Sequence, residues 1–153
     1  MIIRSAGSED RSAVQEILAS CGGFSEDEVR VGLDVFDAAL EGDYSAFVVE
    51  VDGQARAYLC VSLIPMTVST WHLYWIGVQG GFQRLGLGRS LLAHGEAFAR
   101  SSGGERITIE TSGRQDYDRV RLFYEAAGYQ KAGRIPDFYK RGDDCVIYWK
   151  ELA

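Results

Sequence analysis

The chain has 153 residues, 46% of them hydrophobic and 25% charged, which is enough for one domain with its own buried core. Its net charge of −6 argues against a nucleic-acid binder, because such proteins neutralise phosphates with many lysines and arginines. No apolar run approaches the length of a membrane helix, and the N-terminus lacks the order of a secretory signal. We therefore expect a complete cytoplasmic protein with a single domain over 1–153, which binds neither nucleic acid nor membrane.

The N-terminal part of the sequence predicts a strand and two helices. The strand is expected at 1–6, and the first helix follows over 8–20 and stops at a pair of glycines. The second helix starts at a capping box formed by Ser25 and Glu28 and runs to about residue 40. The apolar residues expected to face the core are Val14, Ile17 and Leu18 in the first helix and Val29, Leu33, Phe36 and Leu40 in the second.

The rest of the chain predicts three strands and then alternating helices and strands. The turn Asp52-Gly53 indicates a hairpin between the first two of these strands. The order β-α-α-β-β-β-α-β-α-β-β describes an α/β fold whose mixed sheet has helices on both sides. The expected elements are strands 45–51, 55–64 and 71–78, helix 89–99, strand 106–111, helix 120–126, and strands 129–134 and 145–152.

The cysteines and histidines do not form a recognisable site. Cys21, Cys60 and Cys145 are odd in number and widely spaced, which argues against a disulfide framework or a zinc site. Cys60 and Cys145 lie in strand-like runs and are expected to be small core residues. His72 and His94 are far apart, so we interpret both as structural or surface residues and expect no metal.

The most informative segment is 83–88, with the sequence QRLGLG. It follows the apolar run 71–78 and opens into the helix expected at 89–99. A strand, a glycine loop and a helix start together direct free backbone N–H groups toward an anion, and the two glycines allow a phosphate to approach the backbone. Arg84 and Arg89 add positive charge on either side, so the segment predicts a site for a phosphorylated cofactor.

Two other phosphate-binding motifs fit this segment less well. A Walker A loop, Gly-x4-Gly-Lys-Ser/Thr, requires a Lys and a hydroxyl residue directly after its second glycine, but here Gly86 is followed by Leu87 and Gly88. A dinucleotide fingerprint requires a third glycine where this chain has Leu91, and an acidic residue about 20 residues further on. Glu105 and Glu110 lie near that distance, so the acidic-residue criterion leaves the dinucleotide motif open.

The remaining pattern, Gln/Arg-x-x-Gly-x-Gly, resembles the acyl-CoA pyrophosphate loop of the GCN5-related N-acetyltransferases, or GNAT family. The segment 122–129, LFYEAAGY, is similar to the late helix of that family. The resemblance implies a mixed, mostly antiparallel central sheet and acetyl-CoA as the acyl donor. It also implies a pyrophosphate site at Arg84, Leu85, Gly86, Leu87, Gly88 and Arg89, and pairing of Ile76, Gly77 and Val78 with the pantetheine amides. Gly77 further suggests a β-bulge.

The resemblance also implies two catalytic residues. Tyr124 matches the family tyrosine that protonates the leaving thiolate, a role suited to a phenol with a pKa of about 10. Glu110 is the candidate base that removes a proton from the amine, although it could equally be a salt-bridged surface residue. A half-buried core aromatic is the alternative for Tyr124. Weaker candidates for the base are Asp116, Asp118 and Asp137.

The acceptor side of the predicted site is the less specific part. Tyr117 stands where the family often has an asparagine that contacts the cofactor arm. We expect transfer of acetyl to the primary amine of a small molecule. The alternatives are a protein N-terminal or lysine acetyltransferase, or a non-catalytic acyl-CoA-binding module. Exposed aromatics leave a homodimer open. The residues expected near the acceptor are Phe24, Tyr44, Trp71, Trp75, Tyr117, Asp137, Phe138 and Tyr139.

Overall fold

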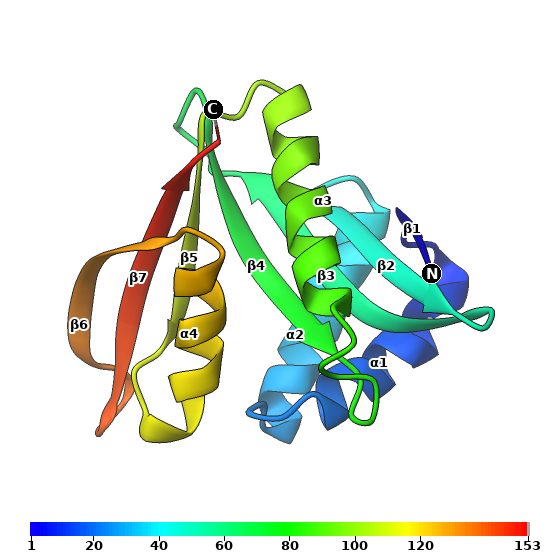
Figure 1. The fold of residues 1–153 in the computed structure, drawn as a ribbon, viewed down its shortest axis with the longest axis horizontal. Helices are drawn as coiled ribbons and strands as arrows, with labels where there is room; N and C mark the ends of the chain where they lie inside the picture. The colour runs from blue at the N-terminus through cyan, green and yellow to red at the C-terminus, as the bar shows by residue number, and fades with distance from the viewer. Residues whose placement is uncertain (153) are drawn as a thin grey trace.

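The computed structural model describes residues 1–152, which form one seven-stranded sheet with helices on both faces (Figure 1). The strands lie in the order β1-β2-β3-β4-β5-β7-β6. The elements are β1 (Ile2–Ser5), a 3-10 turn (Ser8–Asp10), α1 (Arg11–Ser20), α2 (Glu26–Leu40), β2 (Ser45–Val51), β3 (Gln54–Leu63), β4 (Thr70–Val78), α3 (Leu87–Ser101), β5 (Arg106–Ser112), a second 3-10 turn (Gln115–Tyr117), α4 (Asp118–Ala126), β6 (Gln130–Lys140) and β7 (Asp143–Glu151).

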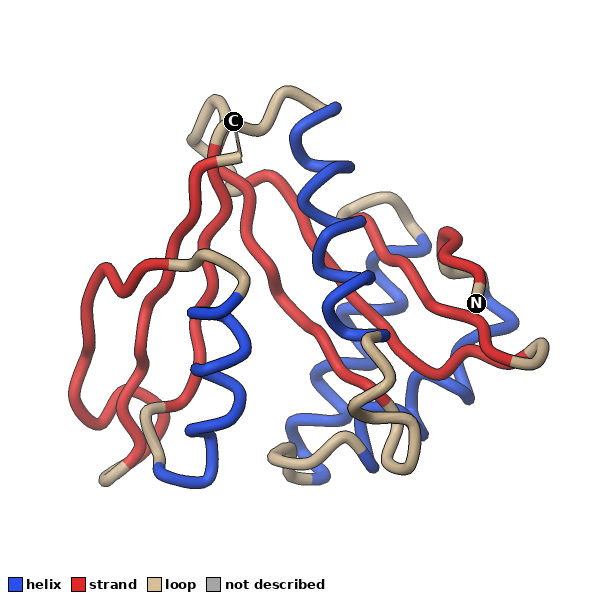
Figure 2. Tube along the Cα trace, in the orientation of Figure 1, coloured by secondary structure: helices blue, strands red, loops and turns tan. Residues whose placement is uncertain are grey.

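The sheet is mixed because β4 and β5 are its one parallel pair, while every other neighbouring pair is antiparallel. Helices α1 and α2 cover one face of the sheet, and α3 and α4 cover the other (Figures 1 and 2). The element order and the mixed, mostly antiparallel sheet predicted from the sequence are therefore confirmed. None of the helices within residues 1–152 is long and apolar enough to cross a membrane.

Several predicted boundaries and one predicted core position differ from the structure. The first helix starts with a 3-10 turn, and α3 begins at Leu87, two residues before the expected start. The last two strands are longer than predicted at the hairpin that joins them, with β6 continuing to Lys140. Leu40 is 40% exposed rather than buried, because it is the last residue of α2.

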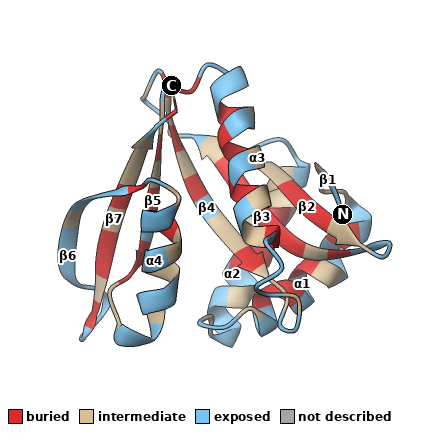
Figure 3. Ribbon diagram, in the orientation of Figure 1, coloured by how far each residue is buried: buried red, intermediate tan, exposed pale blue. Residues whose placement is uncertain are grey.

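Two cores lie on opposite faces of the sheet, and Figure 3 shows the buried residues along the strands and the sheet-facing sides of the helices. The predicted stripe Val14, Ile17 and Leu18 of α1 is fully buried in the core beneath α1 and α2. The other core, beneath α3 and α4, contains Leu91 and Ile107. The predicted core cysteines, Cys60 and Cys145, are both 0% exposed.

The feature of the fold that matters most for function is the point where β4 and β5 separate. The two strands pair from Thr70 with Arg106 to Leu73 with Ile109, and no further pairs follow. Near the last pair, His72 Nδ1 and Thr108 Oγ1 are 2.6 Å apart. Beyond it β4 continues toward the glycine loop while β5 continues beside β7, and the ribbons diverge (Figure 1).

The bulge predicted at Gly77 is wrong, and the irregularity of β4 lies at Tyr74 instead. Gly77 pairs regularly with Tyr58, whereas Val61 pairs with Leu73 and Cys60 with Trp75, which leaves Tyr74 as the additional residue. The glycine at position 77 is explained by packing instead, since a Cβ there would lie 3.3 Å from Cys21 Sγ. The absence of a side chain at 77 therefore allows α1 to pack closely on β4.

Candidate active site

The glycine loop runs from the end of β4 to the start of α3 and is anchored to the end of α1. Gln83 Nε2 donates hydrogen bonds to the carbonyl oxygens of Cys21 at 2.9 Å and Val78 at 3.2 Å. The backbone N–H of Gly80 donates to Ser20 Oγ at 3.0 Å. These bonds fix the course of the loop before α3 begins.

Helix α3 starts without a side-chain cap. Its N-cap residue, Gly86, has a φ of 80° and a ψ of 7°, a left-handed conformation that favours glycine. A Cβ at Gly86 would meet nothing within 4 Å, so the space beside the helix start is open. The first α-helical bond runs from Ser90 N–H to Gly86 O, and the N–H groups of the three preceding residues have no such partner. Uncapped N–H groups at the positive end of a helix dipole favour an anion.

A pocket of about 410 Å³ adjoins this helix start. A Cβ at Gly88 would lie 3.5 Å from Val78 Cγ2 and 3.6 Å from Phe123 Cζ, which both line the pocket. Leu85 is 64% exposed and does not contribute to the lining. The α4 residues were not expected from the sequence, because only the fold brings α4 beside the loop. The lining comprises Val78, Phe82, Gln83, Arg84, Gly86, Leu87, Gly88 and Arg89, with Phe123, Ala126 and Ala127 from α4.

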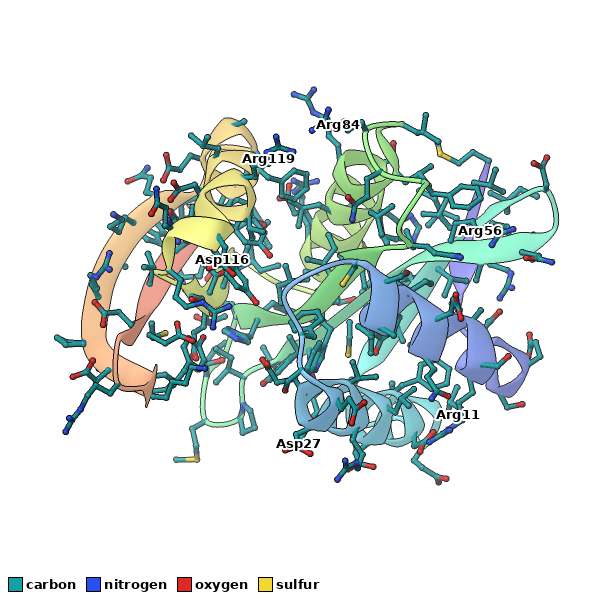
Figure 4. All side chains as sticks on the ribbon, turned by 90° about the horizontal axis from the view of Figure 1, so that it is seen from below. Arg11, Asp27, Arg56, Arg84, Asp116 and Arg119 are labelled. Carbon is teal, nitrogen blue, oxygen red and sulfur yellow. The ribbon has the colours of Figure 1, made fainter. Side chains whose placement is uncertain are left out.

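Three arginines near the pocket are exposed and free of ion pairs with residues 1–152. Arg84 and Arg89 are the two predicted from the sequence. Arg119, from the first turn of α4, is a third cation that sequence reasoning missed. Figure 4 shows Arg84 on the loop and Arg119 on α4, both on the α3 and α4 side of the sheet. Positive charge therefore flanks the pocket on both its loop side and its α4 side.

The edge of β4 that faces β5 is open from Tyr74 onward. Ile76 and Gly77 pair on one side with β3, at Leu59 and Tyr58, but the ladder to β5 has already ended at Leu73. Free N–H and C=O groups of an extended strand can pair with another extended chain. The structure thus places Ile76, Gly77 and Val78 along this strand edge, next to the pocket at the glycine loop, with the carbonyl oxygen of Val78 already accepting a hydrogen bond from Gln83.

Tyr124 lies on the side of α4 that faces the sheet, in the core beneath α3 and α4. It is 5% exposed, and its ring centroid is 6.0 Å from that of Tyr129 and 6.1 Å from that of Tyr148. Burial raises the pKa of the Tyr124 hydroxyl above its ordinary value of 10.0, and interaction with Tyr117 raises it further. The phenol is therefore held in its neutral, proton-donating form.

Glu110 lies on the opposite face of β5 from Tyr124. The neighbouring residues Ile109 and Thr111 are buried, with Ile109 in the core beneath α3 and α4, so the side chain of Glu110 points away from that core. Glu110 is exposed and forms no ion pair with residues 1–152, which does not support the salt-bridged alternative. Cys145 Sγ is 4.0 Å from Glu110 Oε2.

The sequence matches the model of the acetyltransferase (GNAT) family over residues 11–129. The chain belongs to this family. A GNAT-family protein from Desulfovibrio desulfuricans is 34% identical, with a TM-score of 0.94 over 99% of each chain. The ribosomal-protein-S18-alanine N-acetyltransferase from Escherichia coli is 21% identical, with a TM-score of 0.82 over 99% of this chain and 94% of that chain. A Salmonella typhimurium protein solved with acetyl-CoA is 22% identical, with a TM-score of 0.78 over 100% of this chain and 94% of that chain.

A search of curated proteins gives no match to this GNAT chain. The family match and the fold nevertheless confirm the predicted class of enzyme, an N-acetyltransferase. Within residues 1–152 no group of three or more His, Cys, Asp or Glu side chains is arranged to hold a metal ion.

The predicted acceptor residues of the GNAT chain do not all lie together. Trp71 is buried in the core beneath α3, so its assignment to the acceptor side is wrong. Phe24 and Trp75 pack against each other at 5.0 Å beside the α1 and α2 core. Tyr117 Oη donates to the carbonyl oxygen of Gly23 at 2.8 Å and so connects the start of α4 to the loop between α1 and α2.

Proposed function

We propose that this GNAT chain transfers an acetyl group directly from acetyl-CoA to the primary amine of a small molecule. The observation that carries the proposal is the separation of β4 from β5, because it leaves a free strand edge beside an uncapped helix start and a pocket. The residues present fit acetyl-CoA: they offer backbone N–H groups and cations for its phosphates and a strand edge for its amide-containing arm.

The donor side of the proposed site is built by the loop, α3, α4 and β4. The N–H groups around Gly86 and Gly88, with Arg84 and Arg89, would hold the pyrophosphate, and Arg119 would add a contact from α4. The backbone of Ile76, Gly77 and Val78 would bind the pantetheine amides. A backbone N–H of this edge would also stabilise the negative charge that develops on the thioester oxygen.

The two catalytic roles fit side chains on opposite faces of the sheet. Glu110, on the face away from α4, would accept a proton from the acceptor ammonium, directly or through water. The freed amine nitrogen would form the new bond to the acetyl carbon as the carbon–sulfur bond breaks, and it would release its second proton to water, from which Tyr124 regains the proton that it donates. Tyr124, on the α4 face, would give its proton to the departing thiolate. Separation of β4 and β5 would let the two reactants meet from opposite sides of the sheet.

Calorimetric titration with acetyl-CoA is the first test of this proposal. We expect micromolar binding of acetyl-CoA, and no binding of NAD or ATP under the same conditions. An assay for free CoA thiol with a panel of amines then measures turnover. Absence of binding at millimolar acetyl-CoA would overturn the proposal, and binding without turnover of any amine or peptide would indicate a non-catalytic acyl-CoA-binding module.

Arg84→Ala and Arg119→Ala should each raise the Kd of acetyl-CoA by about tenfold in low salt, and by less as ionic strength rises. Both side chains are exposed, so screening by salt weakens their attraction to phosphate. Arg30→Ala is the matched control, since Arg30 is an exposed arginine of α2, paired with Asp27 at 3.0 Å. Equal effects of all three substitutions would mean that only net charge matters and that the cations near the pocket have no specific role.

A further inference from the structure

The face of the sheet that carries Glu110 is only partly covered by helices. Helices α1 and α2 pack over β2, β3 and β4, and within residues 1–152 no helix lies over this face of β5, β7 and β6 (Figures 1 and 4). Glu110 lies on β5, between the covered and uncovered parts. Its carboxylate is therefore exposed where an acceptor amine could reach it from this face.

Aromatic side chains stand on the β4 side of Glu110. The bulge at Tyr74 places its ring 5.0 Å from the ring of Tyr44 and 4.7 Å from that of His72, both edge-on. Tyr74 is 36% exposed, so it offers ring surface while its neighbours fix its position. Tyr74 packs on His72, which pairs with Thr108 of β5, two residues before Glu110. Burial raises the pKa of the Tyr74 hydroxyl, and Tyr44, Cys60 and Glu110 each raise it further.

A second aromatic side chain stands on the opposite side, from the edge strand β6. The pairing of β6 with β7 breaks between Ile135 and Lys140, and the residues between them bulge out of the ladder. Asp137, with a φ of 53°, stabilises this bulge: its N–H donates to Asp144 Oδ1 at 2.9 Å, and its Oδ1 accepts from Gly142 N–H at 2.7 Å. Tyr139 follows, 47% exposed, with its Oη donating to Cys145 Sγ at 3.8 Å.

Among residues 1–152, one carboxylate between these aromatic groups is available to a ligand. The charges of Glu110 and Asp143 both raise the pKa of Tyr139 and Cys145, after the larger effect of burial. Asp143 is already engaged: it is 6% exposed, accepts a hydrogen bond from Ser112 Oγ, and lies 3.4 Å from Arg114 Nη1. Within residues 1–152 Glu110 has no charged partner and accepts only a long hydrogen bond from Cys145 Sγ, at 4.0 Å. The site therefore offers one negative charge between two aromatic surfaces.

We propose that the acceptor is a small monoamine with an aromatic or comparably flat apolar body, and that Tyr74 and Tyr139 determine this specificity. The inference rests on the proposed function, since it takes Glu110 as the residue that meets the amine. One ammonium matches one free carboxylate, and the two tyrosine rings pack on an apolar body and interact with the cation. A polyamine or an aminoglycoside carries several ammonium groups, and these would lack carboxylate partners here.

The test compares four acceptors with acetyl-CoA in the free-thiol assay: 2-phenylethylamine, spermidine, kanamycin and a tetrapeptide with a free N-terminal alanine. We expect kcat/KM for 2-phenylethylamine to exceed each of the others by at least about tenfold. If acetyl-CoA binds but spermidine or kanamycin is preferred, the monoamine inference alone is overturned. If the peptide is preferred, or if none of the four is acetylated, the proposed function is overturned together with it. If acetyl-CoA itself does not bind, the proposed function fails as well, so the two failures are distinguishable.

Variants then assign the specificity to the two tyrosines. Tyr74→Ala and Tyr139→Ala should each raise KM for 2-phenylethylamine by about tenfold, with a smaller change in kcat and an unchanged Kd for acetyl-CoA. Tyr139→Phe keeps the aromatic ring, so its KM for 2-phenylethylamine should stay close to that of the wild type. Leu122→Ala, which removes an apolar side chain 63% exposed on α4, is the control and should change nothing. An unchanged KM in both alanine variants would overturn the role of the tyrosines.

Discussion

Tyr124→Phe is expected to lower kcat by about 10²-fold to 10³-fold and to leave the Kd of acetyl-CoA unchanged. The substitution removes only the phenolic oxygen from a residue that is 5% exposed and packed near Tyr129 and Tyr148. Without this oxygen the departing thiolate must take its proton from water. Steady-state release of CoA thiol measures kcat, and calorimetry without amine measures the Kd.

The raised pKa of Tyr124 fixes the expected pH dependence of this step. Burial disfavours the phenolate, so the pKa lies above the ordinary 10.0 and the hydroxyl stays protonated through the neutral and mildly alkaline range. A general acid is active below its pKa and is lost above it. We therefore expect no fall in kcat on the alkaline side up to about pH 10. If kcat instead falls on the alkaline side at a pH below about 10, and this fall disappears in Tyr124→Phe, the raised pKa of Tyr124 is contradicted.

Tyr129→Phe is a matched control, because it removes another buried phenol from the same core. Tyr129 Oη donates to Glu96 Oε2 at 2.8 Å, so its hydroxyl is engaged within the protein. Its loss should lower the free energy of unfolding by about 1–3 kcal/mol and change kcat little. Equal losses of kcat in Tyr124→Phe and Tyr129→Phe would indicate that Tyr124 is only a core aromatic residue and not the general acid.

The donor side of the site could be predicted from the sequence because its signals are local. Gly86 and Gly88 are two residues apart in one loop, and the left-handed N-cap depends on the absence of a side chain at the single position 86. The element order followed in the same way from apolar periodicity and turn residues. These features need no knowledge of which strands are neighbours.

The acceptor side could not be predicted because its features depend on strand pairing. Tyr74 became the bulge of β4 through its register with β3, whereas the only sequence signal, Gly77, reflects packing against α1. Trp71 was expected near the acceptor but lies in the core beneath α3, since alternation along a strand does not say which face is which. Arg119 lies beside the pocket only because β5 carries α4 back toward the glycine loop.

Glu110→Gln is expected to lower kcat/KM for the amine by about 10²-fold to 10³-fold at pH 7, where alkyl ammonium groups are mostly protonated. The amide keeps the shape of the side chain but cannot accept the proton. As pH rises toward the pKa of the amine, more of the substrate is already neutral and needs no base. The ratio of wild-type to variant kcat/KM should therefore shrink steadily between pH 7 and about pH 10. A ratio independent of pH would contradict the role of Glu110 as base.

His72 is another group on this face that could accept the proton, so His72→Gln distinguishes its role from that of Glu110. Burial lowers the pKa of His72 below 6.5, and the nearby charge of Glu110 raises it only in part, so the imidazole is neutral at pH 7 and able to act as a base. However, its Nδ1 is 2.6 Å from Thr108 Oγ1 and its ring packs on Tyr74, which suits a positioning residue. We expect His72→Gln to raise KM for the amine because Tyr74 loses the ring that positions it. The pH dependence of kcat/KM should remain that of the wild type. If instead the ratio of wild-type to variant kcat/KM decreases with pH for His72→Gln but not for Glu110→Gln, the proton passes to His72. Glu110 would then serve only to attract the ammonium.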